Sequence, residues 1–170
     1  MKTKIFSFLI FLFILTSLAL TSCLKPADDP NTPEKEAELL SAYLNDLAKG
    51  GFNVDTTASG VYYVRRAEGT GPFPEAGDTI SVIYVGYLMN GAVFDASFAV
   101  AADSLWTYVY KSTPTIKGWE DMMPLMNKNC RMEFAVPSSL AYGDQWVGTI
   151  PPYSTLVFVA KMSNIRKKAN

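Results

Sequence analysis

The pattern of apolar and polar positions divides the chain into three parts. Residues 5–20 form an apolar run, IFSFLIFLFILTSLAL, that follows two lysines. Between Leu39 and Leu47, apolar residues recur at the spacing of a helix. Farther along, the period changes to two, and the segments are rich in aromatic and β-branched residues, as half-buried strands are. The pattern therefore predicts one helix followed by a set of strands.

The helix is predicted over residues 33–49. Thr32 can cap its first turn. Pro33 is tolerated at the first helical position because an N–H at that position has no acceptor within the helix, so its absence costs no hydrogen bond. Gly50 and Gly51 end the helix. Its apolar stripe contains Leu39, Leu40, Tyr43, Leu44 and Leu47. Such a stripe docks either on the domain that follows or on a separate partner helix, and we favour the first.

The period-two segments predict an antiparallel sheet. The expected strands cover residues 59–66, 78–89, 92–97, 104–110, 130–136 and 155–165. Asn90-Gly91 predicts a two-residue hairpin turn. Residues 118–126 contain Pro124 and predict only one or two helical turns. Antiparallel strands that enclose one short helix make an α+β domain.

The composition limits the kinds of catalytic site and partner that the chain can have. The 170 residues are 49% hydrophobic and 18% charged, which is enough for one core. The chain has no histidine, and this excludes serine–histidine triads, cysteine–histidine pairs and histidine-ligated metals. The net charge of −1 argues against nucleic acid as a partner. Carboxylates, tyrosines, backbone groups and shape remain, and we expect no metal and no cofactor.

The apolar run ends in Leu20-Thr21-Ser22-Cys23, which resembles a bacterial lipobox. The resemblance implies that residues 1–22 are a signal peptide and that Cys23 becomes acylated, which would anchor the chain to a membrane. A plain signal peptide with an incidental cysteine is the alternative. Residues 23–32 are polar and contain prolines, as a tether does. The expected location is the bacterial cell envelope, at the outer membrane, on its periplasmic or its surface face. The other cysteine, Cys130, is predicted to be buried in a strand.

Four segments in order carry a more specific resemblance. They are GDTISVIYVGYLMNGAVFDAS, TIKGWE, LAYG and IPPYSTLVFVAKM. Their order and approximate spacing resemble the signature of the FKBP-type peptidyl-prolyl isomerases over roughly residues 59–166. The resemblance implies an antiparallel sheet wrapped around a short helix, in a domain assigned to residues 52–168. The N-terminal helix and its end occupy residues 33–51.

The resemblance also implies a proline-binding pocket. The catalytic groups would be Asp95, the Tyr142 hydroxyl and the backbone N–H of Ile116, with Asp95 hydrogen-bonded to Tyr84. The substrate-binding residues would be Tyr84, Phe94, Trp106, Thr115, Trp119, Ile150 and Phe158, with Trp119 as the floor. Pro114 and Thr115 depart from the acidic and aliphatic residues that are usual at these positions, so peptide contacts there would differ.

The implied activity is peptidyl-prolyl cis-trans isomerisation (EC 5.2.1.8) of Xaa-Pro segments in unfolded or secreted proteins. This reaction suits a chain without histidine, because it twists an amide and breaks no covalent bond. The resemblance further implies binding of the macrolides tacrolimus and rapamycin. Two alternatives stay open, a non-catalytic proline-peptide-binding module or chaperone on the same fold, and a purely structural lipoprotein. The intact set of Tyr84, Asp95, Trp119 and Tyr142 favours the enzyme.

Overall fold

A computed structural model describes residues 31–100 and 103–169. These residues belong to one compact unit. The predicted signal peptide, Cys23 and the tether up to Pro30 lie outside the described residues. Within the described ranges, none of the helices has the length and apolar character needed to cross a membrane.

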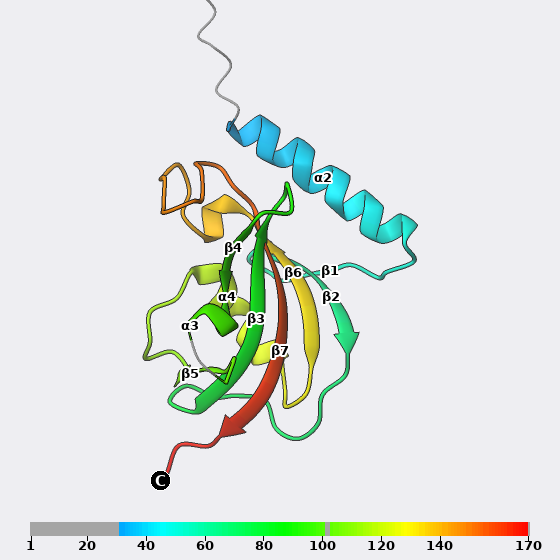
Figure 1. The fold of residues 1–170 in the computed structure, drawn as a ribbon. Coiled ribbons are helices and arrows are strands. Elements are labelled where there is room, and N and C mark those ends of the chain that lie inside the picture. Colours follow the sequence, from blue (N-terminus) through cyan, green and yellow to red (C-terminus); the bar gives the residue numbers. More distant parts are fainter. Residues whose placement is uncertain (1–30, 101–102, 170) are drawn as a thin grey trace, which may run out of the picture. The chain divides into compact units, whose positions relative to one another are not determined.

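The described chain forms a curved antiparallel sheet, a long N-terminal helix and several short helical segments (Figure 1). The helical elements are α2 (Pro33–Lys49), α3 (Ser97–Val100), α4 (Lys117–Met122), η1 (Met123–Leu125) and η2 (Ser138–Leu140). The strands are β1 (Asp55–Thr56), β2 (Tyr62–Ala67), β3 (Thr79–Leu88), β4 (Val93–Ala96), β5 (Trp106–Val109), β6 (Arg131–Val136) and β7 (Leu156–Arg166). Their order is β1-β2-β6-β7-β3-β4, and β5 also pairs with β3. The predicted α+β class, with a sheet wrapped around a short helix and an N-terminal helix before it, is confirmed.

The core lies between the concave face of the sheet and the α4–η1 segment. Alternate residues of the long strands point inward because side chains in a strand change face at every step. On β7 these are Leu156, Phe158, Ala160 and Met162, all buried. Gly118 allows α4 to approach the sheet closely, since a Cβ there would lie 2.3 Å from Cγ1 of Val136. Cys130 is fully buried, as predicted, although it lies just before β6 rather than within it, and burial raises the pKa of its thiol.

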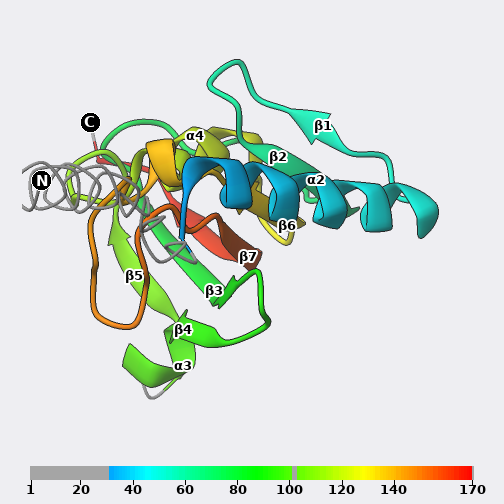
Figure 2. The same cartoon turned by 90° about the horizontal axis from the view of Figure 1, so that it is seen from above.

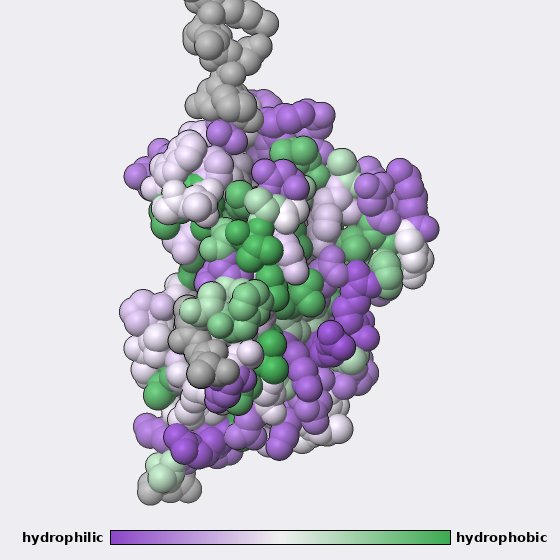
Figure 3. Space-filling model, in the orientation of Figure 1, coloured by the Kyte–Doolittle hydropathy of each residue, from purple (hydrophilic) through white to green (hydrophobic). Residues whose placement is uncertain are grey.

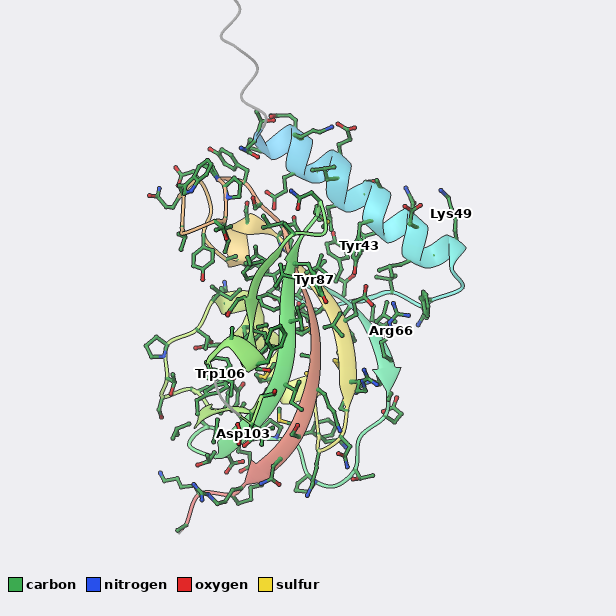
Figure 4. The ribbon with its side chains drawn as sticks, in the orientation of Figure 1. Tyr43, Lys49, Arg66, Tyr87, Asp103 and Trp106 are labelled. Carbon is green, nitrogen blue, oxygen red and sulfur yellow. The ribbon has the colours of Figure 1, made fainter. Side chains whose placement is uncertain are left out.

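Helix α2 packs on the opposite, outer face of the sheet. Seen from above, it runs beside β2 and β6 and away from β4 and β5 (Figure 2). Tyr43 points from the helix toward the sheet (Figure 4), and its hydroxyl donates a hydrogen bond to the outward-facing Glu133 of β6. The helix therefore docks on the domain of its own chain through Tyr43, although none of its residues is fully buried and Leu39 stays 42% exposed.

The helix covers only part of the outer face. Figure 3 shows apolar surface across the middle of the face drawn in Figure 1, over β3 and β7. Ile83 of β3 remains 37% exposed.

Helix α2 begins with the predicted cap, where the Thr32 hydroxyl accepts a hydrogen bond from the Lys35 N–H at 3.2 Å.

The turn between β3 and β4 differs from the prediction. Leu88 N–H donates to the Ala92 carbonyl at 2.9 Å, so the loop contains three residues, Met89, Asn90 and Gly91. Gly91 alone among them has a positive φ, of 83°. A three-residue loop with glycine in the left-handed region is the next most common hairpin connection after the two-residue turn. The predicted two-residue turn is therefore wrong.

Candidate functional site

A pocket of about 190 Å³ opens on the concave side of the sheet. Its walls come from β3, β4, β5, β7, the start of α4 and the loop after η2. The lining residues are Tyr84, Phe94, Asp95, Trp106, Pro114, Thr115, Ile116, Trp119, Tyr142 and Phe158. Every site residue expected from the sequence is among them except Ile150, which is buried in the core cluster instead.

Trp119 forms the floor and is fixed by contacts on several sides. It is 3% exposed. Its indole N–H donates to the Tyr108 hydroxyl at 2.7 Å. The rings of Tyr84 and Phe158 meet it edge-on at centroid distances of 5.1 and 5.2 Å. Edge-to-face pairs of this kind add stabilisation beyond the burial of area, so the floor is rigid.

The Phe94 wall depends on a bulge. Gly86 of β3 pairs with Asp95 of β4, whereas Tyr87 pairs with Val93, which leaves Phe94 as the extra residue. Such bulges are over-represented beside functional sites because they redirect a side chain. The ring then stands over β3, where a Cβ on Gly86 would lie 2.5 Å from its Cζ. Glycine at position 86 therefore makes room for the wall.

Asp95 is held at the pocket edge by two hydrogen bonds. The Tyr84 hydroxyl donates to Oδ2 at 2.6 Å, and the Ala96 N–H donates to Oδ1 at 2.8 Å. The first of these is the bond that the family resemblance implies. Burial, followed by the bond to Asp95, raises the pKa of Tyr84 well above its usual range. The phenol thus stays protonated at neutral pH and remains the donor of this pair.

Two further groups meet at the mouth. Ile116 has extended backbone angles just before α4. Its carbonyl accepts from the Trp119 and Glu120 N–H groups, whereas its own N–H donates to no other described residue. Tyr142, on the facing loop, lines both the pocket and an adjoining hollow of about 390 Å³. The site therefore combines apolar walls with hydrogen-bond donors at its mouth.

Two residues that support the site, Tyr108 and Ser97, were not predicted from the sequence. Tyr108 supports the floor from outside the pocket, and its alternation with Trp106 in one strand is a signal that could have identified it. Ser97 is fully buried, and its hydroxyl accepts a hydrogen bond from the Tyr84 N–H at 3.1 Å. Pro114, which the sequence marks as a departure from the family pattern, lines the pocket beside the start of α4. Nothing in the sequence pattern marks Ser97, because its role depends on a partner in another element.

Comparisons with known proteins agree with this site. The family model described as "FKBP-type peptidyl-prolyl cis-trans isomerase" matches residues 71–163. A probable FKBP-type peptidyl-prolyl cis-trans isomerase of Haemophilus influenzae is 34% identical over 125 residues, which are 73% of this chain and 50% of that protein. The outer membrane protein MIP of Legionella longbeachae is 34% identical over 112 residues, which are 65% of this chain and 46% of that protein.

The solved structures include a similar fold. The crystal structure of FkpA from Escherichia coli superposes with a TM-score of 0.61 and 28% sequence identity, over 78% of this chain and 64% of that one. The chain spans about half the length of the two curated relatives described above. The matched family region contains the whole pocket lining. The chain therefore belongs to the FKBP-type peptidyl-prolyl cis-trans isomerase family.

Proposed function

We propose that this protein catalyses the cis-trans isomerisation of Xaa-Pro bonds in unfolded or secreted proteins. The observation that carries the proposal is the pocket itself, where aromatic walls, the Trp119 floor and two residues with hydrogen-bond donors, Ile116 and Tyr142, line one cavity. An uncharged five-membered ring fits such a surface, whereas a charged side chain would lose its hydration there without a partner.

The pocket favours the twisted amide over the planar one. The barrier of about 20 kcal/mol is mainly the resonance of the C–N bond, which the planar amide has and the twisted amide lacks. Resonance also separates charge, so an apolar pocket stabilises the twisted state more than the planar state. The Ile116 N–H and the Tyr142 hydroxyl would hold the substrate carbonyl while the prolyl ring rests on Trp119. Asp95 would fix the edge of the pocket through Tyr84.

A protease-coupled isomerisation assay tests the activity. The full chain in mild detergent is mixed with a chromogenic Xaa-Pro peptide, and the expected result is a rate that rises linearly with protein concentration. A folded protein that binds a proline peptide by calorimetry without accelerating the reaction would contradict catalysis and support the binding module. An inactive protein that also binds no proline peptide would contradict both.

Macrolide binding probes the same pocket. We propose that tacrolimus and rapamycin enter it, because their ring systems resemble a prolyl peptide and the aromatic walls are present. Pro114 and Thr115 would weaken the fit, since both line the pocket. Competition in the isomerisation assay is the expected result. Uninhibited turnover at saturating macrolide would show that these two residues close the site to the macrolide.

We further propose that the protein acts in the bacterial cell envelope, attached to the outer membrane through acylated Cys23. The lipobox-like junction supports this, as does the outer-membrane name of the Legionella relative. Mass spectrometry of the membrane fraction would find a diacylated Cys23 and no residues 1–22. A Cys23→Ser variant serves as the control and should leave the membrane fraction. An intact amino terminus, or an unmodified Cys23, would contradict the anchor.

A further inference from the structure

The carboxylate of Glu36 joins α2 to the segment that carries Tyr142. Its Oε1 accepts hydrogen bonds from the Ser138 N–H at 2.6 Å and from the Thr155 hydroxyl at 2.7 Å. Its Oε2 accepts from the Ser138 hydroxyl at 2.6 Å. In both ribbon views the first turns of α2 lie near η2 (Figures 1 and 2). One side chain of α2 thus satisfies three donors of the domain.

Ser138 passes this restraint on to Tyr142. Its carbonyl accepts from the N–H groups of both neighbours of Tyr142, Ala141 at 2.9 Å and Gly143 at 2.8 Å. The Gly143 carbonyl in turn accepts from the Tyr153 N–H at 2.8 Å. The backbone on each side of Tyr142 is therefore tied to the residue that Glu36 holds.

The donors that Glu36 satisfies belong to buried residues. Ser138 is 6% exposed and Thr155 is 1% exposed. Without the carboxylate, their hydroxyls and the Ser138 N–H would lose their acceptor, and a buried donor without an acceptor is costly. The segment would then rearrange to find other partners, and the backbone around Tyr142 would move with it. A misplacement of about 1 Å in a positioned group can lower a rate on the order of 100-fold.

We propose that Glu36 is a positioning residue for Tyr142, so that α2 contributes to the geometry of the pocket mouth. This inference rests on the proposed isomerase activity. It assigns a role to a residue outside the matched family region of residues 71–163. Glu36 does not line the pocket, and the proposed effect on Tyr142 passes through Ser138.

The helix offers matched controls. Tyr43 docks the other half of α2 through Glu133, whereas Ser138 is held by Glu36. Glu38 has the same charge as Glu36 on the same helix, but its ion-pair partner among the described residues is the exposed Lys35, at 2.9 Å. Tyr43→Phe therefore loosens the helix without releasing Ser138, and Glu38→Gln removes a charge without altering the docking.

The experiment measures kcat/KM for isomerisation by the full chain in mild detergent. Glu36→Ala should lower kcat/KM about fivefold, an order-of-magnitude expectation for a misplaced hydrogen-bond donor. Glu36→Gln keeps one acceptor oxygen and should lie between Glu36→Ala and wild type. Tyr43→Phe and Glu38→Gln should stay within about twofold of wild type. Equal losses for Glu36→Ala and Tyr43→Phe would overturn the proposal, because helix docking in general would then explain both.

A double-mutant cycle separates positioning from general destabilisation. In a Tyr142→Phe background, Glu36→Ala should cause no further loss of kcat/KM, since the hydroxyl that it positions is gone. An additive loss would overturn the proposal. If Glu36→Ala does not fold, Glu36→Gln takes its place in the cycle.

Amide hydrogen exchange tests whether Glu36 holds the backbone around Tyr142, and this measurement does not depend on catalytic activity. Exchange at the Ala141 and Gly143 N–H groups should become about tenfold faster in the Glu36 variant, because Ser138 is no longer held, and should stay unchanged in Tyr43→Phe. A tenfold change corresponds to about 1.4 kcal/mol of local stability. Unchanged exchange in the Glu36 variant would overturn the proposal. A wild-type protein without turnover would contradict the proposed isomerase function, and the exchange result would still decide whether Glu36 holds this loop.

Discussion

The floor and the mouth of the pocket are built in different ways. The floor consists of Trp119 and the aromatic rings around it, which are packed into the core of the sheet. The mouth consists of Ile116 and Tyr142, which lie on connecting segments held by backbone hydrogen bonds. The floor thus shares its stability with the whole domain, whereas the mouth depends on a few polar contacts.

This difference separates stability from catalysis. Truncating a floor residue removes core packing and pocket surface together. A near-isosteric change at the mouth removes one polar group from a partly exposed segment and leaves the core intact. Mutations should therefore affect both properties at the floor and mainly the rate at the mouth.

The largest effect is expected for Trp119→Ala. Truncation leaves a cavity in the core and removes the donor to Tyr108, so the free energy of unfolding should fall by about 3 to 5 kcal/mol. Turnover should be lost as well, because the surface under the prolyl ring is gone. Denaturant titration and the isomerisation assay measure the two effects. Trp146→Ala is the matched control, since Trp146 is 66% exposed, and a similar loss there would argue against the core role of Trp119.

A somewhat smaller loss of stability is expected for Gly118→Ala, which should displace α4 and with it Trp119. The new Cβ would lie 2.3 Å from Cγ1 of Val136, so α4 must move away from β6. We expect a loss of about 1 to 3 kcal/mol, which is typical of overpacking. Thermal unfolding checks this value. The double variant Gly118→Ala, Val136→Ala should lose less than the sum of the two single changes, and strict additivity would show that the contact is not the cause.

The floor could be predicted from the sequence because the family resemblance implies it, and strand periodicity agrees with the placement of its rings. Phe158 and Tyr84 occupy inward positions of long strands with clear period-two patterns. Trp119 sits in the short TIKGWE segment, which the family signature marks. The helix over Pro33–Lys49 was predicted to the residue, since its start and end carry strong local signals.

The remaining features depend on contacts between distant segments. The two-residue strand β1 has no periodicity to detect. The bulge at Phe94 and the three-residue turn result from how β3 and β4 pair, and local propensity could not choose between two loop lengths. In the sequence, Glu36 cannot be told from any other charged residue in the first turn of a helix, because its partner Ser138 is 102 residues away. Long-range polar contacts of this kind leave no pattern in a single sequence.

At the mouth, Tyr142→Phe and Asp95→Asn should lower kcat/KM about five- to tenfold. Each change removes one hydroxyl or one charge, which is worth about 1 kcal/mol when the group bonds a substrate or orders the pocket edge. The free energy of unfolding should change by less than about 1 kcal/mol. Tyr87→Phe and Asp103→Asn are the controls, because neither residue lines the pocket. If the two mouth variants kept wild-type rates, the roles assigned to Tyr142 and Asp95 would be wrong.

The smallest effect, and one of opposite sign, is expected for Thr115→Val. Thr115 lines the pocket, yet its hydroxyl oxygen is buried and has no hydrogen-bond partner among the described residues. Burying a hydroxyl without a partner costs free energy, and valine has nearly the same shape without that cost. We therefore expect the free energy of unfolding to rise by about 0.5 to 1 kcal/mol. Turnover should be unchanged, because the hydroxyl is turned away from solvent.

Thr107→Val provides the comparison for this change. The Thr107 hydroxyl shares a hydrogen bond of 2.8 Å with Ser81 on the exposed side of β5. The same substitution there removes an existing hydrogen bond, so the free energy of unfolding should fall slightly. Denaturant titration of both variants gives the two signs. A loss of stability in Thr115→Val would mean that the hydroxyl has a partner in solution. A loss of turnover at unchanged stability would mean that the hydroxyl bonds the substrate, and the aliphatic-to-threonine departure at position 115 would then be a feature of specificity.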